Sequence, residues 1–171
     1  MKTLYLVRHG VAVPPGTPEI ADDDRELTKR GARKVEQIGR GLLQLRLKLS
    51  AIVTSPLPRA RKTAEILACE LGLEDRLVLE ETLGATSTAA GIHEWLKTQT
   101  HQHLMIVGHN PSFSNLIGLL LGAGPASLQV ELRKGGIAAF SQTQDDRYHL
   151  DWLARPRLIR SLAKAAGHNH D

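Results

Sequence analysis

The pattern of hydrophobic and polar positions predicts short buried strands that alternate with helices. Leu4 to Val7 form an apolar run that is too short for a helix and stops before Arg8, His9 and Gly10. Such a run is typical of a strand buried on both faces. Further strands are predicted by apolar runs at 51–54, 77–79, 104–107 and 135–141, and by alternating residues at 147–153. A hairpin at 144–146 joins the last two strands.

Between these strands, apolar residues recur every three or four positions, as on the buried face of a helix. Helices are predicted after the caps Thr28, Ser55-Pro56 and Asn110-Pro111 and over 87–99. A further short helix is predicted from residue 155, before a polar tail. The apolar stripe of the first helix consists of Val35, Ile38, Leu42, Leu45 and Leu49. This alternation predicts an α/β protein: a three-layer α/β/α sandwich around a mostly parallel six-stranded sheet with one antiparallel edge strand. We expect a single domain, 1–171, with a core at about 2–153.

Composition excludes several classes of protein. Of 171 residues, 42% are apolar and 23% charged, the proportions of a soluble globular protein. The single cysteine, Cys69, forms no internal disulfide, and no apolar run approaches the ~20 residues of a membrane span. We therefore expect a cytoplasmic protein with no membrane partner. The net charge of +4 suits an anionic ligand, but it is not gathered into the dense basic run of a nucleic-acid-binding protein.

Chemically active residues follow three of the predicted strands. Arg8 and His9 end the first, Ser55 follows the second with Arg59 one turn later, and His109 follows the fourth. The carboxyl ends of parallel strands share one edge of a sheet, where ligands bind. Paired arginines and helix N-termini suit a phosphoryl group, and a histidine with one free ring nitrogen is a competent nucleophile.

Three motifs in this order resemble the histidine phosphatase superfamily, which has the phosphoglycerate-mutase-like fold. They are residues 6–10 (Leu-Val-Arg-His-Gly), residues 54–65, which include Thr-Ser-Pro-Leu-Pro-Arg-Ala and Thr-Ala-Glu, and residues 108–110 (Gly-His-Asn). The resemblance covers residues 2 to about 153. The short chain is most similar to the SixA-type phosphohistidine phosphatases, and residues 25–31 and 135–138 also fit that group.

The resemblance implies a role for each matching residue. His9 is the nucleophile that becomes phosphorylated, Arg8 and Arg59 clamp the phosphoryl group, and His109 is a further phosphate ligand that stabilises the transition state. Arg25 adds a contact from the loop at 11–26, which follows the first strand. No cofactor is implied.

The resemblance also implies a proton donor, a glutamate near the end of the third strand. Glu80 and Glu81 both stand there, and neighbouring residues of a strand point to opposite sides, so one of them at most points inward. We favour Glu81. A phosphohistidine substrate has a labile P–N bond and needs little help from an acid, in which case neither glutamate matters.

Other enzyme classes fit the sequence less well. Arginines beside the two histidines repel a metal ion, and no third ligand has suitable spacing, apart from the polar tail at 168–171. A cysteine phosphatase needs an arginine six residues after Cys69, where Asp75 stands. The chain has neither a phosphate-binding Gly-x-x-x-x-Gly-Lys motif nor a Gly-x-Ser-x-Gly elbow.

These observations predict a metal-independent phosphatase whose substrate is phosphohistidine in a protein. A phosphatase for small esters, such as sugar or nucleotide phosphates, and a non-catalytic module that binds a phosphorylated ligand are the alternatives; the presence of His9 favours an enzyme. A mutase would need a lid that this short chain has few residues to build. The basic residues Arg155, Arg157, Arg160 and Lys164 either dock an acidic partner or form a solvated helix face.

Overall fold

The computed structural model describes residues 2–123, 128–145 and 147–167 and contains one six-stranded sheet. Its elements, in chain order, are β1 (Thr3–Arg8), α1 (Lys29–Gln44), β2 (Ala51–Thr54), α2 (Pro58–Leu71), η1 (Glu74–Arg76), β3 (Leu77–Leu79), η2 (Glu81–Leu83), α3 (Ala89–Lys97), β4 (His103–Gly108), α4 (Ser112–Leu120), β5 (Ile137–Gln142), β6 (Tyr148–Ala154) and α5 (Pro156–Gly167). The two short η elements are 3₁₀ turns.

The strand order is β3-β2-β4-β1-β5-β6, and the first four strands in that order run parallel. The predicted α/β class and mostly parallel sheet are confirmed. The antiparallel strand is β5, which lies one position in from the edge, rather than the edge strand itself. Because β5 runs antiparallel to β1 and its hairpin partner reverses direction again, the edge strand β6 is parallel to β1.

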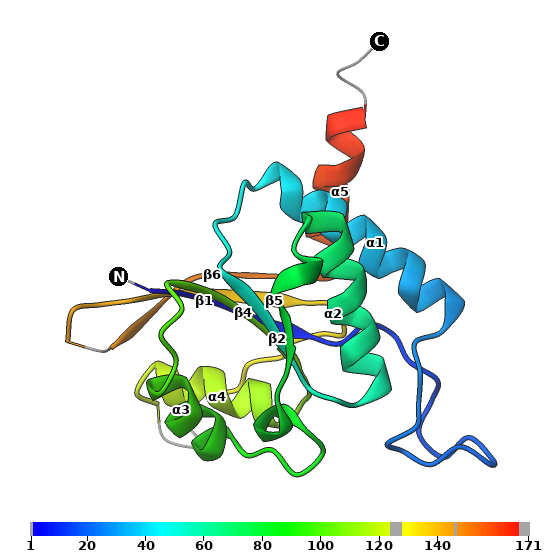
Figure 1. Cartoon of the computed structure of the whole chain (residues 1–171), viewed down its shortest axis with the longest axis horizontal. Coiled ribbons are helices and arrows are strands. Elements are labelled where there is room, and N and C mark those ends of the chain that lie inside the picture. The colour runs from blue at the N-terminus through cyan, green and yellow to red at the C-terminus, as the bar shows by residue number, and fades with distance from the viewer. Residues whose placement is uncertain (1, 124–127, 146, 168–171) are drawn as a thin grey trace.

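Helices cover both faces of the sheet, with α1, α2 and α5 on one side and α3 and α4 on the other (Figure 1). Alternate residues of β1 supply the two apolar layers. Leu4 and Leu6 pack in the cluster on the α3–α4 side, whereas Tyr5 and Val7 pack in the cluster on the α1–α2 side. This alternation explains why the strand is apolar at every position, as expected for a strand buried on both faces.

Two of the three predicted helix caps are corrected. The Thr28 hydroxyl accepts a hydrogen bond from the Gly31 N–H and caps α1 as predicted. Ser55 does not cap α2, because that helix begins at Pro58, and Asn110 does not cap α4, because its amide donates to the Leu132 carbonyl. Instead of capping a helix, both side chains lie at the edge of the sheet where β2 and β4 end.

The C-terminal segment extends the core beyond its predicted limit at residue 153. The helix expected there is α5, which packs along α1 and buries Ile159. The predicted α1 stripe ends earlier than expected, because Leu45 is an exposed C-cap residue and Leu49 follows the helix. Asp146 of the predicted hairpin and the tail at 168–171 lie outside the described residues.

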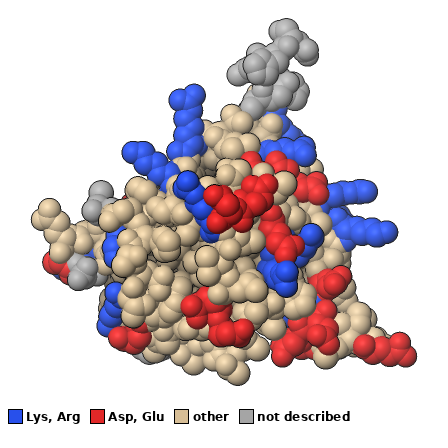
Figure 2. All heavy atoms as spheres, viewed as in Figure 1, with Lys and Arg blue, Asp and Glu red and all other residues tan. Residues whose placement is uncertain are grey.

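A long segment from Gly10 to Thr28 connects β1 to α1 at the carboxyl edge of the sheet. The segment contains no helix or strand, although Ala12 and Leu27 form an isolated β-bridge that closes its base. Figure 2 shows acidic side chains on the surface of this loop and basic side chains on the surface of α1. The loop and the helix therefore place opposite charges beside the same edge.

We predict that Gly41→Ala destabilises the protein by about 1–3 kcal/mol, the cost of overpacking a tight contact. A Cβ at Gly41 would lie 2.1 Å from the carbonyl oxygen of Ile159, so α1 and α5 would have to move apart. Urea denaturation of the two proteins measures the difference.

The control is Gly118→Ala, within α4, where the only described atom within 4 Å of an added Cβ is the Leu128 carbonyl oxygen at 3.9 Å. Alanine stabilises a helix by up to about 1 kcal/mol over glycine when space permits. Equal effects of the two substitutions would contradict the close α1–α5 contact.

Candidate active site

Two histidines and a serine meet where β1, β2 and β4 end. His9 follows β1, Ser55 follows β2 and His109 follows β4, and all three are buried. The ring centroids of His9 and His109 are 5.2 Å apart, with the rings tilted by 50°. The predicted convergence of strand ends at one edge thus brings the two imidazoles together.

The His9 ring is held in a defined orientation. Its Nδ1 lies 2.7 Å from the Gly10 carbonyl oxygen, and since a carbonyl only accepts, this contact assigns the proton to Nδ1. The Nε2 lone pair is then unprotonated. The Gly10 N–H donates to the Thr63 hydroxyl, which in turn donates to the Arg59 carbonyl. These bonds fix the turn after β1 against the first turns of α2.

The His109 ring is positioned by Ser55. Its Nε2 lies 2.8 Å from the Ser55 hydroxyl oxygen, which also accepts a hydrogen bond from the Leu57 N–H. The Nδ1 of His109 is buried and has no partner among the described residues. Ser55, expected as a helix cap, therefore orients a histidine of the site.

Three arginines surround the histidines, and a backbone carbonyl anchors each guanidinium. Arg8 donates to Leu132, Arg25 to Val13, and Arg59 to Asp22, at 2.7–2.9 Å. The Nε groups of Arg8 and Arg59 are buried without a partner in the described part of the chain. The structure brings together the side chains of the predicted residues Arg8, His9, Arg25, Arg59 and His109.

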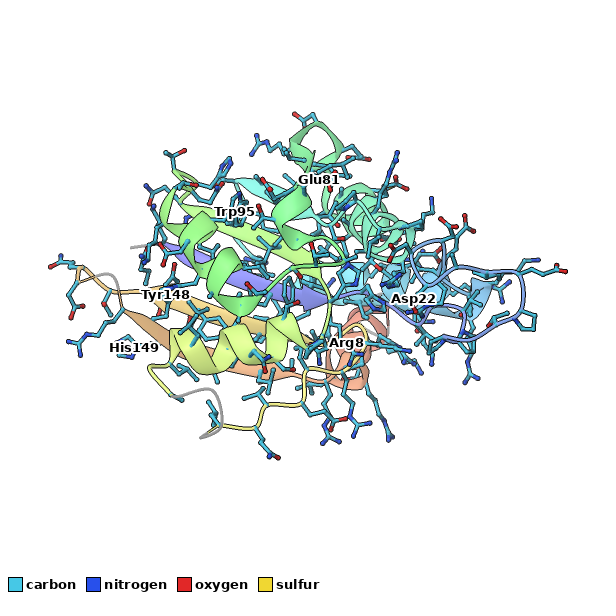
Figure 3. The ribbon with its side chains drawn as sticks, turned by 90° about the horizontal axis from the view of Figure 1, so that it is seen from below. Arg8, Asp22, Glu81, Trp95, Tyr148 and His149 are labelled. Carbon is cyan, nitrogen blue, oxygen red and sulfur yellow. The ribbon has the colours of Figure 1, made fainter. Side chains whose placement is uncertain are left out.

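One carboxylate lies among these guanidiniums. Asp22 accepts hydrogen bonds from Arg25 Nε at 2.8 Å and Arg59 Nη2 at 3.4 Å. Arg8 and Asp22 lie at the same end of the sheet, opposite the end that carries Tyr148 and His149 (Figure 3). The hydrogen bond from Arg25 is the main cause of the lowered pKa of Asp22. The site thus already holds one anion, contributed by its own loop.

Burial and positive charge keep both imidazoles neutral. Burial is the main reason that the pKa of His9 falls to about 3 and that of His109 to about 4. Arg59 and Arg8 lower both values further, because they disfavour another positive charge nearby. At neutral pH, His9 therefore carries the lone pair that a nucleophile requires.

The two candidate proton donors lie outside this network of hydrogen bonds. The Glu80 carboxylate accepts from Thr82 and from the Trp95 indole; burial alone would raise its pKa, but these bonds outweigh burial and lower it. Glu81 is exposed, and its side chain has no hydrogen-bond partner in the described ranges. Since Glu80 caps the η2 turn and Glu81 begins it, the alternation of a strand does not apply to them. Glu81 as proton donor stays a prediction.

Sequence reasoning missed four residues that contribute to the site: Asp22, Ser55 in its observed role, Thr63 and Lys134. Lys134 is half-buried, and burial together with the charges of Arg8, Arg25 and Arg59 lowers its pKa. Ser55 and Thr63 had a signal, since both stand in the motif at 54–65, whereas Asp22 and Lys134 had none.

Comparison with known proteins agrees with this geometry. A family model described as histidine phosphatase superfamily (branch 1) matches residues 4–84. An uncharacterised protein of Picosynechococcus sp. is 34% identical over 139 residues, which cover 78% of this chain and 81% of that protein. The chain belongs to the histidine phosphatase superfamily. The mitochondrial serine/threonine-protein phosphatase Pgam5 of Drosophila melanogaster is 33% identical over 76 residues, 44% of this chain but a quarter of that protein.

Solved structures of several phosphatases share the fold of this histidine phosphatase. The protein histidine phosphatase SixA, solved with tungstate, superposes with a TM-score of 0.80 at 19% identity and covers 92% of this chain and 99% of that chain. A phosphoserine phosphatase variant of Entamoeba histolytica, solved with phosphoserine, has a TM-score of 0.71 at 18% identity, with 92% and 98% covered. The fold alone is therefore shared by proteins named for different substrates.

The described residues contain neither a metal-binding cluster nor a membrane-spanning helix. No group of three or more His, Cys, Asp or Glu side chains is arranged to hold a metal ion. No described helix is long and apolar enough to cross a membrane.

We predict that the free energy of unfolding falls as the pH is lowered from about 6.5 to about 4. In that range the unfolded chain protonates His9 and His109, with ordinary pKa values near 6.5, while the folded protein keeps them neutral. Each histidine adds a slope of up to about 1.4 kcal/mol per pH unit. Urea denaturation at several pH values measures the slope, which becomes shallower in a His9→Gln/His109→Gln variant; an unchanged slope would show that these two rings do not cause it.

We also predict that Asp22→Asn strengthens the binding of tungstate severalfold, because it removes the carboxylate that already lies between Arg25 and Arg59. Isothermal titration calorimetry measures the affinity. Asp24→Asn removes the same charge from a residue of the same loop for which the structure gives no arginine contact, and serves as the control. Weaker binding to the Asp22→Asn protein would instead show that the carboxylate holds the arginines in place.

Proposed function

We propose that this histidine phosphatase is a metal-independent hydrolase that forms a covalent phosphohistidine on His9 and acts on phosphohistidine in a protein. The observation that carries the proposal is a buried, neutral His9 whose Nε2 is free beside the guanidiniums of Arg8 and Arg59. A neutral imidazole next to an anion-binding pocket is suited to attack phosphorus.

In the first step, the Nε2 lone pair of His9 bonds to phosphorus and the bond from phosphorus to the substrate nitrogen breaks. The substrate nitrogen keeps the electron pair and takes a proton from solvent. His9 retains its Nδ1 proton through the Gly10 carbonyl, so the phosphorylated ring is cationic. A cationic imidazole is a good leaving group because it departs as neutral imidazole.

In the second step, the oxygen of a water molecule bonds to phosphorus and the bond to Nε2 breaks. Inorganic phosphate leaves, a proton passes to solvent, and His9 returns to its neutral form. In both steps, Arg8, Arg25 and Arg59 face the phosphoryl oxygens with fixed positive charges, and His109 lies beside His9. Such preorganised charge is the main way in which phosphoryl transfer is accelerated.

The surroundings of the site favour a protein substrate. Only residues 55–57 separate β2 from α2, and only residues 109–111 separate β4 from α4, so neither turn builds a wall around the site. Small ligands are usually enclosed by a pocket that buries most of their surface. Small phosphate esters remain the second candidate, favoured by the shared fold of the phosphoserine phosphatase.

We predict that His9→Ala abolishes turnover and the covalent intermediate. The experiment offers each protein, with EDTA present, a phosphohistidine-bearing phosphocarrier protein and, separately, a panel of phosphate esters. Intact-mass spectrometry after rapid acid-free quenching follows the phosphorylated enzyme. Wild type is expected to gain one phosphoryl group and to release phosphate.

The control is His149→Ala, which removes an exposed histidine at the opposite end of the sheet and is expected to leave turnover unchanged (Figure 3). Preference for an ester would keep the mechanism and move the substrate class to small molecules. Full activity in His9→Ala would overturn the assignment of the nucleophile.

A further inference from the structure

The positive charge of the chain is concentrated on two adjacent helices. Helix α1, together with Arg155 and α5, holds nine of the 22 basic residues and one of the 18 acidic residues, a net charge of +8 against +4 for the whole chain. The rest of the chain is therefore net negative. The basic residues are Lys29, Arg30, Arg33, Lys34, Arg40, Arg155, Arg157, Arg160 and Lys164, and the acidic one is Glu36.

This charge does not serve the stability of the helices. The first turns of α1 and α5 contain no acidic residue, whereas Lys29, Arg30 and Arg157 lie there. The N-terminal end of a helix carries a partial positive charge, which favours acidic side chains and disfavours basic ones. The basic residues in the first turns of both helices oppose the helix dipole, although Lys164 in the last turn of α5 does not, so the N-terminal charges point to a role outside the helices.

Few of these charges are neutralised within the protein. Arg40 pairs with Glu70 at 3.4 Å, and Arg160 donates to the amide oxygen of Gln37. Six others have no side-chain hydrogen bond or ion pair to any described residue. They are Lys29, Arg30, Arg33, Lys34, Arg155 and Arg157. These six cations are therefore available to pair with acidic groups of another molecule.

The charged helices begin at the carboxyl edge of the sheet, next to the active site. A small hollow of about 60 Å³ there is lined by Gly10, which follows His9, and by three basic side chains, Lys34 of α1, Arg160 of α5 and Lys134. No acidic residue lines it. The hollow therefore joins the basic helices to the turn that carries the nucleophile.

Lys134 connects this hollow to the phosphoryl pocket. The next residue, Gly135, donates its N–H to the carbonyl oxygens of Arg8 and His9, at 2.9 and 3.1 Å, which fixes Lys134 beside the end of β1. The positive charges of Arg8, Arg25 and Arg59 act on its ammonium. Positive charge thus continues from the pocket through Lys134 to α1 and α5.

We propose that the α1–α5 basic face, defined as Lys34, Arg155, Arg157 and Arg160 with Lys134 at its inner end, docks an acidic surface beside the phosphorylated residue of a protein substrate. The inference deepens the proposed function, since it presumes that the substrate is a protein. Complementary charge around a site steers association and weakens as salt increases. The docked partner would lie across α1 and α5 with its phosphoryl group at His9.

The test compares two phosphohistidine peptides that differ only in the flank of the phosphorylated residue, about four glutamates in one and as many glutamines in the other. We expect kcat/KM of wild type to favour the acidic peptide about tenfold at low ionic strength. The preference declines as salt is added, since the Debye length falls to about 8 Å at 0.15 M. The same pair of flanks is also built around phosphoserine.

Two variants with equal loss of charge locate the effect. Lys34→Gln/Arg157→Gln/Arg160→Gln removes three charges from the basic face and is expected to lose the preference for the acidic flank. Arg76→Gln/Lys97→Gln/Arg147→Gln removes three charges at the opposite edge of the sheet, where β3, β4 and β6 begin, and is expected to keep it. Lys134→Gln is measured separately, because that side chain also faces the phosphoryl pocket.

The outcomes separate this proposal from the proposed function. If phosphohistidine peptides are not hydrolysed but the acidic flank still favours phosphoserine peptides, the substrate linkage is wrong and the docking surface stands. No flank preference in wild type, or an equal loss in the two triple variants, would overturn the docking surface. Fluorescence anisotropy provides a further test: tighter binding of a single-stranded oligonucleotide than of the acidic peptide would overturn the assignment to a protein partner.

Discussion

The active site depends on holding like charges close together in a buried place. Arg8, Arg25 and Arg59 repel one another, and burial removes the water that would otherwise screen them. Each is kept in place by a backbone carbonyl, and two of them also share the carboxylate of Asp22. The fold supplies these carbonyls from two loops, the segment between β1 and α1 and the segment that precedes β5. The fold therefore offsets the repulsion between these guanidiniums before a phosphoryl group binds.

The same electrostatic constraint keeps His9, the proposed nucleophile, neutral. Burial and the neighbouring guanidiniums disfavour a proton on Nε2 of His9, while the Gly10 carbonyl retains the proton on Nδ1. In the proposed mechanism, one arrangement thus both attracts the anion and keeps Nε2, the attacking atom, unprotonated. A phosphoryl dianion would offset the charges of the arginines, and the cationic ring formed by its transfer would then be stabilised beside it. The proposed mechanism therefore couples substrate binding electrostatically to the formation of the intermediate.

The residues of the site that could be predicted from sequence are those placed by the sheet. Apolar runs locate the strands, and parallel strands end at one edge, so Arg8, His9 and His109 had to lie together. Asp22 and Lys134 lie in loops, where no periodicity reports on position. Ser55-Pro56 and Asn110-Pro111 fit the pattern of helix caps, and only the observed starts of α2 and α4 show that their side chains make other contacts. The position of β5 could not be predicted either, since a predicted hairpin does not show which of its two strands pairs with β1.

The modest net charge of the chain conceals how its charge is placed. Helices α1 to α5 all begin near the carboxyl edge of the sheet, so the positive ends of their dipoles point toward the side on which the site lies. The basic residues of α1 and α5 add to this field, and among those of α1 only Arg40 is paired with a carboxylate of the described residues, that of Glu70. A phosphorylated protein approaching the molecule would be oriented by this asymmetry before it made contact. Because the turns that follow β2 and β4 are short, such orientation would contribute to selectivity for a protein substrate under the proposed function.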